Sequence, residues 1–112
     1  MRVRIVRNED VKFLATFIPL GHRHVRVIIN LGDEILIFQQ AFIDALIRAY
    51  ASVALHPYKK CQALTLRKLS SKERKEGFAE YQLIELSIDE DRMLYSLTKL
   101  YNRAIGSTKV YK

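Results

Sequence analysis

The sequence predicts an α+β protein: a two-layer sandwich in which two helices cover one face of a mainly antiparallel sheet of about five strands. Short runs in which apolar and polar residues alternate are typical of half-buried strands. Two longer runs, 33–55 and 89–105, repeat apolar residues every three or four positions, as amphipathic helices do. With 112 residues and 49% hydrophobic composition, the chain has the size of one domain, so we expect a single domain over 1–112.

The N-terminal part is expected to form a hairpin over residues 1–18. Residues 1–7 alternate Arg with Val or Ile, and Asn8 to Asp10 supply turn-forming side chains before a second extended run. After Pro19-Leu20-Gly21, a third strand is expected at about residues 24–30. The hairpin therefore precedes the main part of the domain.

The first helix is expected over residues 33–55, with Asp33 as its cap and His56-Pro57 as its end. Extended runs at about 61–69 and 78–87, joined by a polar loop, predict two more strands before the second helix. The expected element order is βββαββα. From about residue 24 to 105 this is the order of a ferredoxin-like split βαβ unit.

The net charge of +7 is concentrated in two segments. Residues 1–30 contain six basic and two acidic side chains, and residues 59–77 contain seven basic and two acidic ones. The other two parts of the chain, 31–58 and 78–112, sum to −2 and to zero. This distribution is typical of a surface that binds a polyanion such as nucleic acid.

Strand parity and loop position divide the candidate nucleic-acid-binding residues into two groups. Arg side chains form forked hydrogen bonds to phosphates, and each neutralised phosphate releases counterions. The alternative for both groups is a solvated surface that serves solubility. The first group, on a shared sheet face, is Arg2, Arg4, Lys12, His24 and Arg26; the second, on the later loop, is Arg67, Lys68, Lys72, Arg74 and Lys75.

His22 and His24 lie two residues apart, a spacing that places both side chains on one side of a strand. The His-x-His pattern resembles the metal-binding strand of rolling-circle replication nucleases. That resemblance implies a metal-dependent nuclease, with Tyr95 or Tyr101 as nucleophile and a further ligand such as His56 or Cys61. The alternative is that both histidines are ordinary loop and strand residues.

The remaining sequence contains no phosphate-binding glycine loop, nucleophile elbow or Cys-x-x-Cys pair. We therefore expect no catalytic residue, metal or cofactor, and the leading hypothesis is a small nucleic-acid-binding or nucleoprotein-assembly module that is not an enzyme. A protein-interaction or dimerisation subunit of a larger complex is the alternative, and the nuclease is a third.

The element order over about residues 24–105, together with the basic character, resembles two families of archaeal RNA-associated subunits. These are the ferredoxin-like protein subunit of ribonuclease P and the dimerising subunit of the tRNA-modifying KEOPS complex. The resemblance implies RNA as a partner and a two-layer fold. It includes no shared motif, so no residue role is carried over.

The remaining expectations concern compartment and oligomeric state. A lone Cys61 cannot form an internal disulfide, and no run is apolar enough for a membrane span, so a cytoplasmic protein is expected. In the predicted helix 33–55, four side chains widen the apolar surface beyond one stripe: Ile37, Ile43, Ile47 and Tyr50. This predicts a homodimer with that helix at or near the interface.

Overall fold

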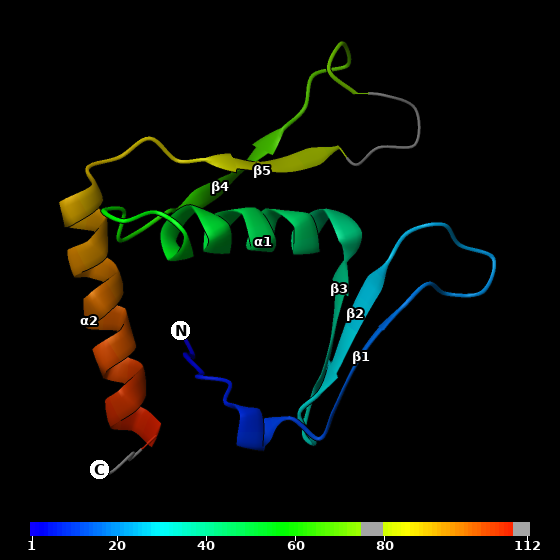
Figure 1. Cartoon of the computed structure of the whole chain (residues 1–112), viewed down its shortest axis with the longest axis horizontal. Helices are drawn as coiled ribbons and strands as arrows, with labels where there is room; N and C mark the ends of the chain where they lie inside the picture. Colours follow the sequence, from blue (N-terminus) through cyan, green and yellow to red (C-terminus); the bar gives the residue numbers. More distant parts are fainter. Residues whose placement is uncertain (75–79, 109–112) are drawn as a thin grey trace.

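A computed structural model describes residues 1–74 and 80–108 of the chain (Figure 1). The α+β class is confirmed, with five strands and two helices in the described part. In chain order, the elements are the 3₁₀-helix η1 (Asn8–Asp10), strands β1 (Phe13–Phe17), β2 (Arg26–Asn30) and β3 (Ile35–Gln39), helix α1 (Gln40–Ala54), strands β4 (Leu64–Lys68) and β5 (Tyr81–Glu85), and helix α2 (Glu90–Thr108).

The strands form two sheets instead of the single five-stranded sheet that the sequence predicts. One sheet has the order β1-β2-β3 and the other is the β4-β5 hairpin, and every described pairing is antiparallel. A ferredoxin-like unit requires the strands before and after its first helix to share one sheet. Here they do not, so the ferredoxin-like arrangement is not observed.

The predicted hairpin over residues 1–18 is wrong, because residues 1–7 form no strand. The Arg7 backbone N–H donates to Asp10 Oδ2 at 3.0 Å, and the Asp10 N–H donates to the Arg7 carbonyl at 2.9 Å. These short-range bonds satisfy the backbone locally in η1. Strand β1 pairs with β2 instead.

The predicted helix 33–55 begins later, at Gln40, and its first residues form strand β3. Gly32 has φ +91°, and its N–H donates to Asn30 Oδ1 at 2.8 Å; the Leu31 N–H donates to the Glu34 carbonyl at the same distance. This tight turn reverses the chain, so the backbone of β3 bonds to β2. Asp33 is part of the turn and does not cap a helix.

Helix α1 connects the two sheets. It continues directly from β3, where the Phe38 and Phe42 rings meet edge to face with centroids 5.0 Å apart. It also lies alongside β4 and β5, separated from them by a hollow of about 490 Å³ whose walls include Phe42, Leu66 and Leu83. Helix α2 runs across the direction of α1 at the opposite side of the chain from β1 (Figure 1).

Few side chains of the described residues are buried. The buried apolar residues are Leu31, Ala45, Cys61 and Ala104, and none of the large side chains is fully enclosed. Cys61 is a buried free thiol, as expected for a small apolar side chain, although it lies just before β4 and not within it. Much of the apolar surface of the helices and strands is therefore exposed in the isolated chain.

Candidate nucleic-acid interface

The five residues predicted to share a basic sheet face are not brought together. Arg2 and Arg4 belong to the irregular N-terminal segment. Arg4 Nη1 lies 3.2 Å from Asp33 Oδ1 and 3.8 Å from Glu34 Oε1. The Arg4 guanidinium donates a hydrogen bond to the Asp33 carboxylate, and this bond lowers the pKa of the Asp33 carboxyl below its usual range. Two carboxylates at the β2–β3 turn thus offset the charge of Arg4.

Lys12 and Arg26 lie at opposite ends of the three-stranded sheet. Lys12 precedes β1, its N–H donates to the Asn30 carbonyl at 2.8 Å, and its side chain lies beside Gly32. Arg26 begins β2 at the other end and pairs with Phe17. Since directly paired residues of antiparallel strands share a face, Arg26 lies on the same face as Phe17, and Lys12 has the opposite parity.

The connection between β1 and β2, together with the first residue of β2, is a cationic hairpin end, which we define as residues 19–26. Gly21 has φ +81°, and the His22 N–H donates to the Pro19 carbonyl at 2.9 Å, so the chain turns sharply here. Arg26 Nη1 donates to the His24 and Val25 carbonyls at 2.9 and 3.4 Å. No acidic residue occurs anywhere from Val11 to Gly32.

Arg23 at this hairpin end is a further candidate phosphate contact that was not among the binding residues predicted from the sequence. It is exposed and forms no ion pair with a described residue. The signal was present in the sequence, because Arg23 follows a Pro-Leu-Gly turn between two extended runs. Strand parity favoured its neighbours His24 and Arg26 and excluded Arg23, although parity does not apply in a loop.

The second cationic hairpin end joins β4 to β5, and we define it by residues 67–74. Arg67 forms a two-pronged pair with Glu73, with Nη1 to Oε1 at 3.2 Å and Nη2 to Oε2 at 2.8 Å. Arg74 Nη1 lies 3.2 Å from Glu80 Oε1. Lys68 and Lys72 are exposed and have no ion pair among the described residues, while Lys75 lies outside the described residues.

Glu73 is held in the charged form by this environment. Hydrogen bonds from the Arg67 guanidinium, the Ser70 N–H and the Ser70 hydroxyl lower its pKa from 4.5 to about 2, and the pairing raises the pKa of Arg67. The contribution of this pair to stability is present above about pH 4.5 and is lost as the pH falls through about 2.

We therefore expect the Glu73 side-chain carboxyl to titrate well below 4.5, the value expected without its partners. In a carbon-detected NMR titration, its resonance should still report the ionised form at pH 3.5. An Arg67→Ala variant should move the Glu73 midpoint back toward 4.5. A Glu73 midpoint near 4.5 in the unmodified protein would contradict the described pair.

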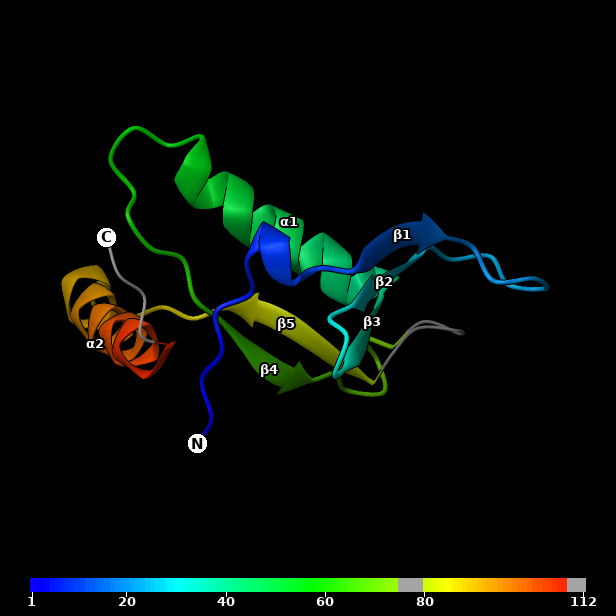
Figure 2. The ribbon, with the colours of Figure 1, turned by 90° about the horizontal axis from the view of Figure 1, so that it is seen from below.

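The two cationic hairpin ends lie on the side of the chain away from α2 (Figures 1 and 2). Figure 1 is viewed with the longest axis horizontal, and Figure 2 is turned by 90° about that axis. In Figure 1, the β1–β2 connection extends along this axis, whereas the described part of the β4–β5 hairpin end rises across it; in both views, the two lie on the side away from α2. Sequence reasoning predicted both basic segments but not their place on this side of the chain.

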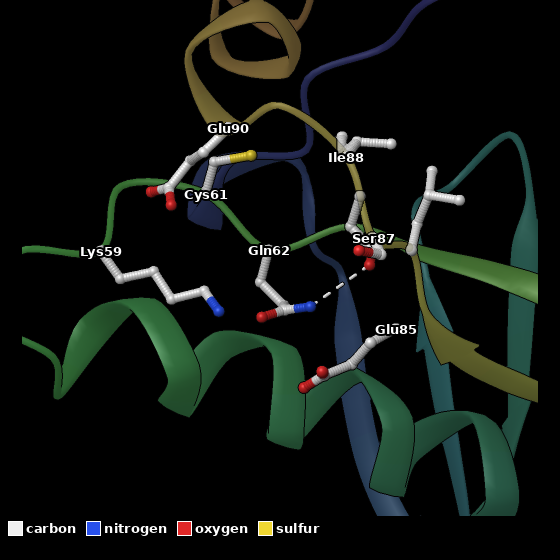
Figure 3. Close-up of a pocket in the computed structure, with 9 residues that line it drawn as sticks. Lys59, Cys61, Gln62, Glu85, Ser87, Ile88 and Glu90 are labelled. Carbon is white, nitrogen blue, oxygen red and sulfur yellow. Dashed lines mark hydrogen bonds between the residues drawn. The ribbon is translucent and has the colours of Figure 1, made fainter.

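A hollow of about 320 Å³ lies between the segment before β4 and the segment after β5. Figure 3 shows Lys59, Gln62 and Glu85 around it, with Cys61 and Glu90 on the neighbouring wall. The Gln62 amide donates to the Ala63 carbonyl at 3.3 Å, and its Oε1 is buried without a hydrogen-bond partner among the described residues. Glu90 Oε1 accepts from the Lys60 N–H at 2.9 Å and thus ties this segment to the start of α2.

Among the described residues, the fold does not bring a third metal ligand close to His22 and His24, although the metal-dependent nuclease hypothesis requires one. His22 and His24 lie in the β1–β2 connection, and the described residues contain no group of three or more His, Cys, Asp or Glu side chains that could hold a metal ion. His56 is engaged elsewhere, because its Nδ1 accepts hydrogen bonds from the Tyr58 and Lys59 N–H groups at 3.1 and 2.9 Å.

Searches for similar proteins add no family assignment. Comparisons with protein-family models, with curated proteins and with solved structures found no match to this chain. Among the described residues, no helix combines the length and apolar character that crossing a membrane requires.

Proposed function

We propose that the protein is a nucleic-acid-binding module without catalytic activity, and that its two cationic hairpin ends contact the phosphate backbone. The observation that carries the proposal is that both hairpin ends lie on the side of the chain away from α2, so that one extended ligand can contact both (Figures 1 and 2). Four cations there form no ion pair among the described residues: Arg23, Lys68 and Lys72, which are exposed, and Arg26, which is half-buried. Phosphate contacts by Arg and Lys supply most of the affinity of sequence-independent binding.

The test is binding of fluorescently labelled single- and double-stranded DNA and RNA, followed by anisotropy across a salt series. Each phosphate contact releases counterions, so the logarithm of the association constant should fall linearly with the logarithm of salt concentration. With four contacts to duplex DNA, the slope is expected to be roughly −3.6. Undetectable binding at low salt, or binding indifferent to salt, would contradict the proposal.

Removing a neutralising carboxylate should strengthen binding. In Glu73→Gln, Arg67 loses its ion-pair partner and becomes available as a further phosphate contact. We expect the salt slope for duplex DNA to steepen by about 0.9, which corresponds to roughly eightfold tighter binding at 0.1 M salt. A Glu9→Gln variant gains the same charge away from both hairpin ends, so it serves as the control and should change affinity much less.

A second candidate function, the protein-interaction subunit, is favoured by the exposed apolar side chains of α1. Phe42, Leu46, Ile47 and Tyr50 lie on one side of this helix and are all exposed, with Tyr50 72% accessible. Monomeric soluble proteins seldom leave so many neighbouring apolar side chains in water. Such a subunit would use these residues to dock on a partner.

A further inference from the structure

The isolated chain exposes far more surface than a compact protein of its size. Its accessible area is 9670 Å², whereas a folded monomer of 13.1 kDa is expected to expose roughly 6,400 Å². The radius of gyration is 16.9 Å, against about 13 Å for a compact chain of this length. The excess of roughly 3,300 Å² is more than one chain contributes to a typical obligate dimer, which is about 1,000–2,500 Å².

Part of this surface is one face of the three-stranded sheet, which we call the sheet patch. The register of β1, β2 and β3 determines which side chains lie on this face, because directly paired residues share a face. Phe13, Ile35 and Ile37 are 54, 57 and 58% exposed. The patch consists of Phe13, Ala15, Phe17, Ile28, Ile35 and Ile37.

The other face of the sheet is the one that meets α1. Phe38 has the opposite parity to Ile35 and Ile37, and its ring contacts Phe42 of the helix. The sheet patch is therefore on the side away from that contact. Figures 1 and 2 show both helices lying to one side of the sheet.

The charge distribution indicates what covers the patch. Its six members are uncharged, and the polar residues on this face, Arg26, Asn30 and Gln39, lie at the ends of the strands. An acidic partner protein would find no cation at the centre of the patch to pair with. A second copy of the same apolar face can cover it without burying an unpaired charge, and two apolar sheet faces pack well at about 10 Å separation.

We propose that the sheet patch is the interface of a homodimer, in which two copies pack face to face about a two-fold axis near Ile28. An isologous contact uses the same residues twice, so six apolar side chains per chain supply twelve to the interface. This interface differs from the predicted helix 33–55 interface, because Ile35 and Ile37 belong to β3. It does not depend on nucleic-acid binding.

Sedimentation equilibrium of the full chain from 1 to 100 µM tests the proposal, with Ile37→Asp as the disrupting variant. The unmodified protein should be a dimer, and Ile37→Asp should weaken association at least 100-fold, since it would bury a carboxylate in the interface. Leu14→Asp is the matched control, because Leu14 is 56% exposed in the same sheet and has the opposite parity. A monomeric unmodified protein would overturn the proposal, and so would an Ile37→Asp protein that remains a dimer.

A cross-linking measurement covers the case in which Ile37→Asp loses its fold together with its partner. In a Cys61→Ala background, Ile28→Cys places a thiol at the middle of the central strand, close to its counterpart across the two-fold axis. A bifunctional thiol reagent with a reach of about 10 Å, the separation of packed sheets, should give a cross-linked dimer, whereas Leu14→Cys in the same background should stay largely monomeric on a denaturing gel. Equal cross-linking of the two variants, or none for Ile28→Cys, would overturn the sheet-patch interface.

Salt separates this proposal from the proposed function. Two chains of net charge +7 repel, so raising the salt concentration should leave the dimer intact or strengthen it. The same change should weaken nucleic-acid binding. If the protein is a dimer but binds no nucleic acid, only the proposed function is contradicted. If the protein is a monomer that binds nucleic acid in a salt-dependent way, only the proposed dimer is contradicted.

Discussion

Removing four cations of the hairpin ends that form no ion pair among the described residues should lower affinity for duplex DNA by roughly 4,000-fold at 0.1 M salt. Each phosphate contact contributes about 0.9 logarithmic units at this salt concentration relative to 1 M, so four contacts give about 3.6 in total. The variant carries alanine at Arg23, Arg26, Lys68 and Lys72. Anisotropy titrations over a salt series measure both the affinity and the slope, which should approach zero if these are the main contacts.

The control for this prediction removes the same charge from elsewhere in the chain. Its four alanines replace Arg48, Lys60, Arg92 and Lys99, which are exposed and lie outside both hairpin ends. Both variants have a formal net charge of +3 instead of +7. If the control loses as much affinity as the hairpin-end variant, binding follows net charge alone and the hairpin ends have no special role.

Replacing Gly32 by Ala should destabilise the fold by about 1–2 kcal/mol. Gly32 has φ +91°, a conformation that a Cβ disfavours, and the added Cβ would lie 3.3 Å from Lys12 Cε. This turn reverses the chain between β2 and β3, so its strain weakens the whole three-stranded sheet. Thermal unfolding by circular dichroism, at one fixed protein concentration, should show a Tm lower by roughly 5–10 °C.

Gly106→Ala is the matched control for the Gly32 variant. Gly106 lies within α2, and nothing lies within 4 Å of an added Cβ. Alanine is the better helix former, so this variant should be neutral or more stable by up to about 1 kcal/mol. A Gly32→Ala protein as stable as the unmodified chain would contradict the turn that makes residues 35–39 a strand.

Residues 35–39 show why sequence reasoning predicted the composition of the fold better than its boundaries. The run Ile-Leu-Ile-Phe-Gln is apolar at nearly every position, so it matches a strand and the first turn of a helix equally well. The choice depends on the backbone partner, which is β2, and this pairing is not visible in a local pattern. Gly32 was the available signal, because it permits a tight hairpin turn before Ile35.

The N-terminal residues show the opposite limitation. Arg2 to Arg7 alternate as a strand does, yet a strand requires a neighbouring edge with which to form hydrogen bonds. The predicted partner of this segment is the run that forms β1, and β1 pairs with β2 instead. By contrast, α2 was predicted over 89–105 and extends over Glu90–Thr108, so its start was predicted to within one residue. Asp89 accepts a hydrogen bond from the Arg92 N–H at 3.2 Å there, which is local chemistry.

The sequence predicted which segments of the candidate site carry basic residues, but it did not predict how the fold arranges these residues. Counting charges identified both basic segments, and the 67–74 group does form one hairpin end. The ion pairs of Arg4, Arg67 and Arg74 depend on which carboxylates the fold brings near, and these cations are thereby partly neutralised. Proximity of Arg4 to Asp33, 29 positions apart, cannot be inferred from local spacing.

The most direct test of the central claim is an NMR titration of the ¹⁵N-labelled protein with a short DNA or RNA duplex at low salt. The account predicts that backbone amides of both hairpin ends, residues 20–26 and 67–74, shift together with one binding curve, while those of α2 change little. Shifts confined to one hairpin end, or centred on α2, would contradict the claim that the two ends contact one nucleic-acid ligand.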